Sequence, residues 1–240
     1  MAFTFFFRDR HTLDALLDHA LPVVQGQAFI RIWDAGCAHG PEPYTLAILL
    51  RERTSDFVFR NVHIHATDVD RQFGATIAAG IYAEQEVKRI PPDIRARHFR
   101  PAEEPGRVQV ADELRRKVTF AEHDLLALRP IREDFSLIVC KNVLLHFSES
   151  QRIEVLRMFH RALRPGGILA TEPTQKMPDR LAPWFEAVSS STQIHRRLEG
   201  PHFDREAAGG TDSRLPCKTV DGSERTSKPR WRWTHALCGR

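Results

Sequence analysis

Hydrophobic residues along the first part of the chain alternate between helical spacing and short continuous runs. The clearest helical pattern predicts a helix over residues 10–24 that Pro22 ends, and its apolar side chains are Leu13, Leu16, Leu17, Ala20 and Leu21. Further helices are predicted over residues 43–53, 72–79, 148–163 and 181–188. Ser148 and Gln151 form a capping-box pattern at the start of one of them, and Gly80 follows the end of another.

Short apolar runs between these helices predict the strands of a sheet. They cover residues 28–35, 62–70, 117–125, 135–147, 167–173 and 193–198. The run at 135–147 is the most hydrophobic and suits a strand buried on both faces of a parallel sheet. Strands that alternate with helices of this length predict an α/β fold, with a mostly parallel sheet, right-handed crossovers and helices on both faces.

Two stretches do not fit this alternation. Residues 91–117 are polar and contain Pro and Gly, so we expect a small excursion there, with a hairpin near Arg107–Val110. The apolar periodicity then ends near residue 200, which predicts one domain over residues 1–199 and a disordered tail over residues 200–240. Within this tail, Trp231, Arg232 and Trp233 form a basic aromatic cluster that could contact nucleic acid or a membrane surface. The interpretation we favour is that the cluster is part of an unstructured terminus.

The composition excludes several classes of protein. Of the 240 residues, 42% are hydrophobic and 28% charged, and no apolar run approaches the ~18–20 residues that cross a bilayer. The four cysteines form no CxxC pair, which disfavours a disulfide framework and predicts a reducing, cytoplasmic environment. The 35 basic and 31 acidic residues are a mixture typical of a solvated surface, which permits but does not indicate a nucleic-acid partner.

The residues best suited to ligand binding lie at the ends of the predicted strands. In a doubly wound sheet, ligands bind beyond the carboxyl ends of the strands, where the strand order reverses. The sequence DAGCAHG after the first strand contains Gly36 and Gly40, which let a ligand approach the backbone, although such glycines often only form a tight turn. Asp68 in the second strand could accept hydrogen bonds from both hydroxyls of a ribose, whereas Asp70 fits the N-cap of the next helix.

Later strand ends offer further interpretations. Asp124 could hydrogen-bond the amino group of an adenine with Leu125 against its ring, or could serve only to form a turn. Because no GKS or GKT sequence is present, a nucleoside without phosphates fits better than ATP. A metal site is disfavoured because no HExxH or close Cys/His pair occurs among the candidates Cys37, His39, His63, His65, His123, Cys140 and His146.

A series of short motifs runs along the chain in a fixed order. They are TFFFR at 4–8, CAHGPEPYTLA at 37–47, ATDVD at 66–70, GIY at 80–82, CKNVLLHF at 140–147 and LRPGG at 163–167. In the same order they resemble TxFFR, CSTGEEPYSLA, atDiD, GIY, CRNVLIYF and LxPGG of the CheR-type chemotaxis-receptor glutamate methyltransferases. The resemblance covers about residues 1–198 and implies a Rossmann-like, class I S-adenosylmethionine (SAM) methyltransferase.

The resemblance also implies roles for individual residues. Arg8 would pair with the carboxylate of the SAM methionine moiety, Glu42 would bind its ammonium, and Asp68 would take the ribose. The implied cofactor-binding residues are Thr4, Arg8, Gly36, Glu42, Asp68, Asp124, Leu125, Lys141 and Asn142. For catalysis, Arg8 is expected to position charge near the reaction and His146 to contact the substrate.

Several positions depart from the family's motifs. Asp34 is uncommon in the family, although other class I methyltransferases carry it at the end of the first strand. Asp124 stands where the family has Asn and cannot donate a hydrogen bond to an adenine nitrogen, and Lys141 replaces an Arg and loses its bidentate geometry. His146 replaces a Tyr thought to lie near the reacting groups, and Thr174-Gln175 replaces a Ser-Glu pair.

Together these patterns predict a cytoplasmic enzyme that O-methylates a glutamate carboxylate of a protein, such as a chemoreceptor, and forms S-adenosylhomocysteine. A glutamate carboxyl group has an ordinary pKa of about 4.3, so it is ionised at neutral pH and needs no general base. The helical domain that usually precedes TxFFR and contributes to receptor recognition is not expected here. Methylation of a small molecule and a SAM-binding regulatory module without turnover therefore stay open, whereas membrane insertion and nucleic-acid binding are not expected.

Overall fold

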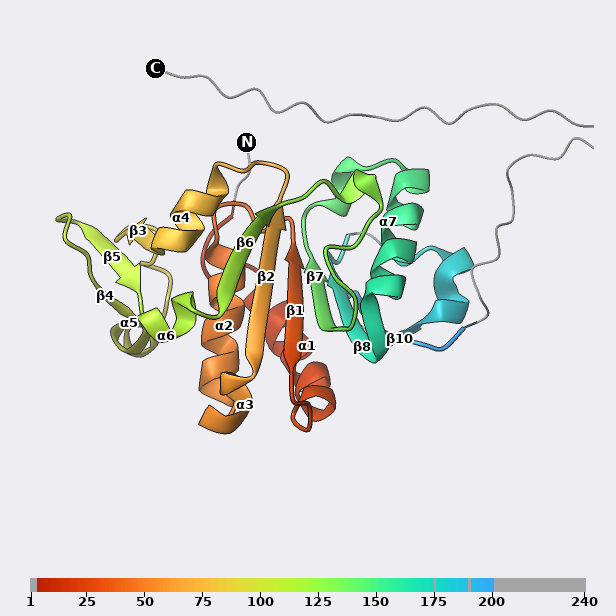
Figure 1. Cartoon of the computed structure of the whole chain (residues 1–240), viewed down its shortest axis with the longest axis horizontal. Helices are drawn as coiled ribbons and strands as arrows, with labels where there is room; N and C mark the ends of the chain where they lie inside the picture. The colour runs from red at the N-terminus through yellow and green to blue at the C-terminus, as the bar shows by residue number, and fades with distance from the viewer. Residues whose placement is uncertain (1–3, 175, 190, 201–240) are drawn as a thin grey trace, which may run out of the picture. The chain divides into compact units, whose positions relative to one another are not determined.

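A seven-stranded sheet forms the centre of the computed structural model, which describes residues 4–174, 176–189 and 191–200 (Figure 1). Its strand order is β6-β2-β1-β7-β8-β10-β9. The strands are β1 (Ile30–Ala35), β2 (Val62–Asp68), β6 (Val118–Glu122), β7 (Phe135–Cys140), β8 (Leu163–Thr171), β9 (Phe185–Ala187) and β10 (Ile194–Arg197). The first five of these pair in parallel, and β10 runs antiparallel to both β8 and β9. The chain therefore builds outward from β1 to β6, then returns to β7 on the other side of β1, which makes the β1–β7 edge the switch point.

Helices connect the strands and cover both faces of the sheet, as the hydrophobic pattern predicts. They are α1 (Arg10–Val24), α2 (Pro41–Arg53), α3 (Asp56–Arg60), α4 (Phe73–Ala79), α5 (Pro92–His98), α6 (Asp112–Arg115) and α7 (Glu149–Ala162), with 3₁₀ turns η1 (Leu125–Ala127), η2 (Leu144–His146) and η3 (Asp179–Trp184). Ser148 and Gln151 form the predicted capping box at the start of α7. No helix within the described part of the chain combines the length and hydrophobicity that a bilayer crossing requires.

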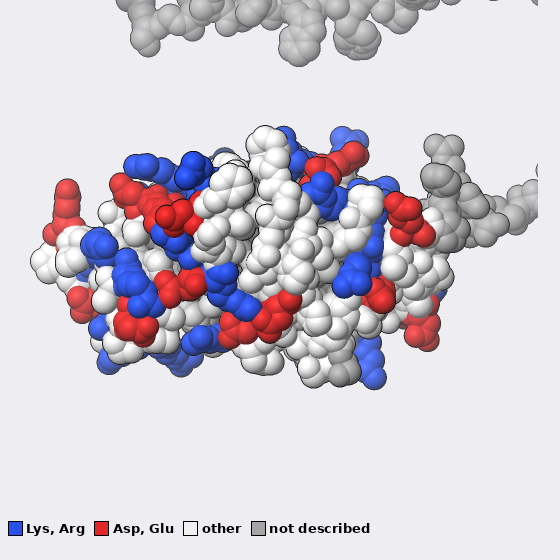
Figure 2. All heavy atoms as spheres, turned by 90° about the horizontal axis from the view of Figure 1, so that it is seen from below, with Lys and Arg blue, Asp and Glu red and all other residues white. Residues whose placement is uncertain are grey.

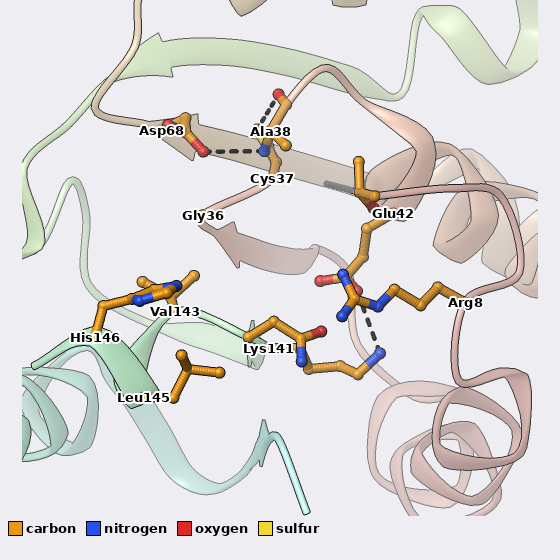
Figure 3. Close-up of a pocket in the computed structure, with 12 residues that line it drawn as sticks. Arg8, Gly36, Cys37, Ala38, Glu42, Asp68, Lys141, Val143, Leu145 and His146 are labelled. Carbon is orange, nitrogen blue, oxygen red and sulfur yellow. Dashed lines mark hydrogen bonds and ion pairs between the residues drawn. The ribbon is translucent and has the colours of Figure 1, made fainter. Parts of the chain in front are cut away.

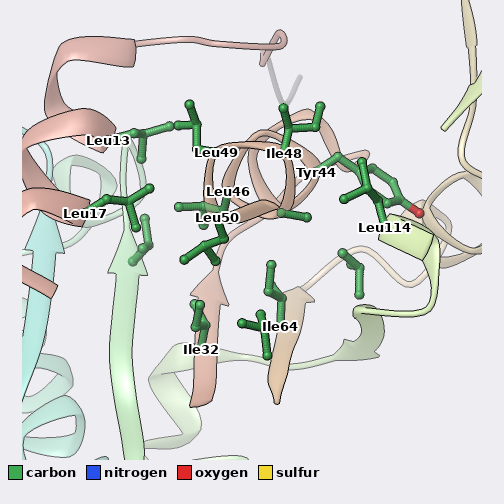
Figure 4. Close-up of a cluster of buried hydrophobic side chains, with 14 of the residues drawn as sticks. Leu13, Leu17, Ile32, Tyr44, Leu46, Ile48, Leu49, Leu50, Ile64 and Leu114 are labelled. Atoms are coloured by element: carbon green, nitrogen blue, oxygen red, sulfur yellow. The ribbon is translucent and has the colours of Figure 1, made fainter. Parts of the chain in front are cut away.

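The main core lies between the sheet and the helices α1 and α2 (Figure 4). Ile32 and Ile64 are register partners on neighbouring strands and point toward α2, where Leu46 and Leu50 are buried. Burying each such side chain contributes roughly 1.5–3 kcal/mol to stability. Because side chains alternate across a strand, the neighbouring Trp33 faces the opposite layer, where its ring lies 5.2 Å from that of Phe159 on α7.

The predicted excursion is a second, three-stranded sheet in the order β3-β5-β4. It consists of β3 (Ile81–Ala83), β5 (Arg107–Val110) and β4 (Phe99–Pro101), all antiparallel. The expected hairpin near residues 107–110 is confirmed, but the excursion begins earlier than residue 91 because β3 pairs with β5. Tyr82 of β3 donates a hydrogen bond to the carbonyl of His39, at 3.0 Å, and so joins this sheet to the loop after β1.

Some local predictions are wrong. The predicted bounds of α1, residues 10–24, are confirmed, but Pro22 lies inside the helix and does not end it, because Leu21 and Val24 are buried and hold its last turn against the core. The predicted helix over 181–188 is instead the 3₁₀ turn η3 followed by β9, because β9 pairs with β10. The sequence RPGG, at residues 164–167, was expected to lie between α7 and the next strand. It instead lies within β8, which begins at Leu163, and the pairing of β8 with β7 is irregular at this point.

Asp70 does not cap the next helix. The helix α4 begins at Phe73, and the Asp70 carboxylate accepts a hydrogen bond from the backbone of Gln72 at 2.9 Å, which forms a turn before the helix. The predicted tail, with its Trp231–Trp233 cluster, lies outside the described residues except for Gly200. Figure 2 shows Lys and Arg side chains mixed with Asp and Glu across the visible face, without a continuous patch of either sign.

Candidate cofactor site at the carboxyl edge of the sheet

A cavity of about 410 Å³ lies at the switch point of the sheet (Figure 3). Segments far apart in the sequence meet there: the N-terminal residues, the loop after β1, the end of β2 and the loop after β7. The predicted site residues that line it are Thr4, Arg8, Gly36, Glu42, Asp68, Lys141, Asn142 and His146. The cavity is also lined by four residues that lie within the motifs but were given no role in cofactor binding: Cys37, Ala38, Val143 and Leu145.

The floor of the cavity is the turn between β1 and α2. Gly36 adopts a φ of +97°, which L-residues rarely adopt, and a Cβ at this position would lie 2.2 Å from Cγ2 of Val143. The Gly36 backbone donates a hydrogen bond to the carbonyl of Thr67, at 2.8 Å. The glycine is therefore required for the close approach of this turn to the loop after β7.

Asp68 lies at the end of β2 and faces the same turn. Its Oδ2 accepts a hydrogen bond from the Ala38 backbone at 3.0 Å, and its Oδ1 accepts one from the Asp70 backbone at 3.2 Å. A carboxylate offers about four lone-pair sites, so these two bonds fix its orientation and leave capacity for further donors. Such a group suits the two adjacent hydroxyls of a ribose.

Alternating charges line the opposite end of the cavity. The fully buried Lys141 side chain places Nζ 3.3 Å from Glu42 Oε2 and 3.3 Å from Asp9 Oδ2. Figure 3 shows the Arg8 guanidinium and the Glu42 carboxylate pointing toward one another, and Arg8 Nε also lies 3.9 Å from Asp9 Oδ2. Adjacent cationic and anionic groups of this kind match a zwitterion, such as the amino-acid end of SAM.

Hydrogen bonds hold the N-terminal segment against this end of the site. The Phe7 backbone donates to Oγ1 of Thr45 at 3.0 Å, and this hydroxyl in turn donates to the Pro41 carbonyl at 2.6 Å. Phe6 is completely buried, with its ring 4.9 Å from that of Tyr82. These contacts anchor the TFFFR motif to α2 and position Arg8 beside Glu42.

Asp124 and Leu125 do not line this first cavity but a neighbouring one of about 330 Å³. The two cavities share Gly36, Asp68, Val143 and His146 among their lining residues. Asp124 also accepts a hydrogen bond from the Leu126 backbone at 2.8 Å, so it forms the turn that the sequence left as its alternative role. The lining here is largely apolar, which suits the face of an aromatic base.

Two buried groups at the site, Asp34 and Cys37, have strongly shifted pKa values. Burial, and then the neighbouring Glu42 carboxylate, raise the pKa of Asp34 well above its usual range. Burial likewise raises the pKa of the Cys37 thiol, so this cysteine lines the cavity as a neutral group. Asp9, which pairs with Lys141, has no motif of its own that could have revealed its role.

The donor set fits a nucleoside joined to an amino acid. The mixed-charge end belongs to one cavity and the apolar lining to the other, and Asp68, which can hold a ribose, lines both. Within residues 4–174, 176–189 and 191–200, no group of three or more His, Cys, Asp or Glu side chains is placed to hold a metal ion. Thr174 is exposed, and Gln175 lies outside the described residues.

A mostly parallel sheet with this site at its switch point defines the class of protein as a Rossmann-like, class I SAM-dependent methyltransferase. The family model "CheR methyltransferase, SAM binding domain" matches residues 2–194. The chain therefore belongs to the CheR methyltransferase family, and its cofactor is SAM.

Similar proteins are methyltransferases of chemotaxis. A probable chemotaxis protein methyltransferase of Rhizobium etli is 32% identical over 199 residues, which span 79% of this chain and 73% of that protein. The chemotaxis protein methyltransferase of Escherichia coli K12 is 33% identical over 169 residues, or 69% of this chain and 58% of that protein. Among solved structures, the N-methyltransferase NodS of Bradyrhizobium japonicum aligns with a TM-score of 0.45 at 16% identity, covering 80% of this chain and 97% of that one.

Proposed function

We propose that this methyltransferase acts on a glutamate side chain of a protein, and that its acceptor is a chemoreceptor. The similarity to chemotaxis protein methyltransferases supports the acceptor class. The observation that carries the proposal is the convergence of Arg8, Glu42, Asp68 and Lys141 on one cavity at the carboxyl edge of the sheet. On this proposal the protein works in the cytoplasm, and residues 1–199 form its catalytic domain.

Each predicted residue receives a role from its place around the two cavities. Asp68 holds the ribose hydroxyls, and Glu42 and Arg8 hold the ammonium and carboxylate of the methionine moiety. Lys141 keeps Glu42 in place, and Asp124 with Leu125 flanks the adenine. Thr4, Gly36 and Asn142 complete the lining, and Asn142 adopts a left-handed backbone conformation with a φ of +61°.

The chain's own contribution to the reaction is positioning and exclusion of water. When bound, SAM supplies a methyl group already activated by its sulfonium. A glutamate carboxylate with an ordinary pKa of about 4.3 is ionised at neutral pH, so no residue has to remove a proton from it. His146, and Leu145 with 42% of its surface exposed, lie where the acceptor would approach and would displace water from its carboxylate.

Incubation with tritiated SAM and a chemoreceptor cytoplasmic fragment tests this function. We expect label on the receptor that mild base releases as methanol, because a carboxyl methyl ester is base-labile whereas N- and C-methyl groups are not. Asp68→Ala should abolish most of the label, and Asp70→Ala should not. Base-stable label, or label only on small molecules, would contradict the proposed acceptor, and binding of S-adenosylhomocysteine without any transfer would favour the regulatory alternative.

A further inference from the structure

Asp34, at the end of β1, is completely buried directly beneath the cofactor site. Neither of its carboxyl oxygens receives a hydrogen bond from a described donor. A buried carboxylate without donors is costly, because ionised groups lose their hydration in the interior. The residue is also absent from the cavity lining, so it does not touch the ligand space itself.

The groups that face Asp34 come from every neighbouring element. Glu42 of α2 is the strongest influence, and Lys141 after β7, Asp68 at the end of β2 and the thiols of Cys37 and Cys140 also interact with it. Lys141 is a buried cation that interacts with Asp34, but its ammonium already pairs with Glu42 and Asp9. Ionised Asp34 would therefore place another negative charge beside Glu42 without a cation of its own.

We propose that Asp34 is held as a neutral carboxylic acid and donates its O–H hydrogen bond to Glu42. Asp34 is then a positioning residue: it holds the Glu42 carboxylate from below while Lys141 holds it from the side. This arrangement leaves Glu42 directed at the cavity, where it can receive the ammonium of SAM. The inference rests on the proposed role of Glu42 and extends it to a group that does not contact the ligand.

Independent properties of the site agree with this arrangement. The two causes that most raise the pKa of Asp34 are its burial and the Glu42 carboxylate, and the opposing effect of Lys141 is smaller. Two carboxyl groups in contact can hydrogen-bond only if one of them keeps its proton. A neutral acid that serves as a hydrogen-bond donor inside an active site has a precedent in other enzymes.

The substitution Asp34→Asn tests the proposal, because the amide donates hydrogen bonds and cannot ionise. Infrared spectra of the wild type at pH 7 should contain the C=O stretch of a protonated carboxyl group, and Asp34→Asn should lower its intensity in wild-type and Glu172→Gln backgrounds alike, since Glu172 is a second buried carboxyl group with a raised pKa. The matched control Asp70→Asn replaces an exposed aspartate and should leave this band in place. In titrations with S-adenosylhomocysteine, the Kd of the Asp34→Asn variant should lie within about threefold of the wild-type value. Asp34→Leu should raise the Kd about tenfold or more.

Thermal unfolding across pH provides a second readout that a purely structural role would not change. The unfolded chain releases the Asp34 proton above a pKa of about 3.9, whereas the folded chain keeps it. Raising the pH therefore destabilises the wild type relative to Asp34→Asn, so the Tm of the wild type minus that of Asp34→Asn should decrease from pH 5 to pH 7.5. Asp70→Asn should show no such trend.

Absence of the infrared band in the wild type, or an unchanged band intensity in Asp34→Asn, would overturn the proposal. A Tm difference that stays constant with pH would overturn it as well. These results are separate from the failure of the proposed function, which would appear as a wild type that does not methylate the receptor. The infrared and unfolding measurements need neither cofactor nor acceptor, so they apply even if Asp34→Leu does not fold.

Discussion

The Asp68 carboxylate accepts a hydrogen bond from the Ala38 backbone, at 3.0 Å, and this bond joins the end of β2 to the turn after β1. The two segments are neighbours because β1 and β2 pair in parallel, with Ala35 opposite Thr67. Asp68 therefore has a structural role in the turn as well as the proposed role toward a ribose. A substitution at this position should affect both stability and ligand binding.

Asp68→Ala should raise the Kd for S-adenosylhomocysteine about tenfold to a hundredfold, because hydrogen bonds to a charged group contribute about 1.5–3 kcal/mol. It should also lower the free energy of unfolding by about 1 kcal/mol through the lost bond to Ala38. Calorimetric titration and urea unfolding measure the two effects. Asp70→Ala is the control, since Asp70 lines neither cavity. An unchanged Kd for Asp68→Ala would remove the ribose assignment.

Lys141→Met should destabilise the protein by about 3 kcal/mol, because removing one partner of a buried ion pair leaves a charge uncompensated. The Lys141 side chain is fully buried, and it contacts both Glu42 and Asp9 at 3.3 Å. Lys141→Arg keeps the positive charge and should lose less stability. Urea unfolding of the two variants gives the comparison, and equal stabilities for Met and the wild type would show that the pairs contribute no net stabilisation.

The fold could be predicted largely from local patterns. The strand and helix periods of β1, β2, β7 and α2 are continuous in the sequence, and the capping box of Ser148 and Gln151 fixes the start of α7. The segment 181–188 could not be assigned in this way, because pairing with β10 decides that residues 185–187 form a strand. Helical spacing of a few apolar residues carries no information about such a partner.

The site residues divide in a similar manner. The motifs single out Arg8, Glu42 and Asp68, and the structure brings them to one cavity. Asp9 was not predicted, because its role depends on Lys141, which is distant in the sequence and adjacent only in the fold. The burial of Asp34 could not be predicted either, since a strand-end aspartate is as often a solvated turn residue.

His195 should contribute a loss of thermal stability on acidification between about pH 7.5 and pH 5.5, opposite in sign to the contribution proposed for Asp34. Burial lowers the pKa of His195 in the folded chain, so the folded state keeps the ring neutral while the unfolded chain binds a proton below about pH 6.5. The stability that His195 contributes is therefore lost as the pH falls through this range. His195→Gln should show a smaller decrease in Tm on acidification than the wild type.

Replacement of the exposed His11 by Gln serves as the control for this measurement, since its ring contacts solvent in the folded state. His195→Gln should also have a lower Tm than the wild type at pH 7.5, because His195 is only 5% exposed and its ring packs near Phe185. Only the pH dependence identifies the protonation effect. Parallel Tm profiles of His195→Gln and the wild type would contradict it.

Arg8→Ala should reduce kcat/KM for methyl transfer at least about tenfold, because the guanidinium is the proposed partner of the methionine carboxylate and such charge-assisted bonds contribute about 1.5–3 kcal/mol. Arg8→Lys keeps the charge but loses the planar fork, so its activity should fall between those of Ala and the wild type. The control is Arg10→Ala, which removes an exposed pair with Asp14 at 3.2 Å and lines neither cavity. Initial rates with tritiated SAM, together with Kd values for S-adenosylhomocysteine, separate binding from turnover. If Arg8→Ala matched the wild type in both, Arg8 would have no role in cofactor binding, and Lys141 would be the remaining cation able to hold the carboxylate.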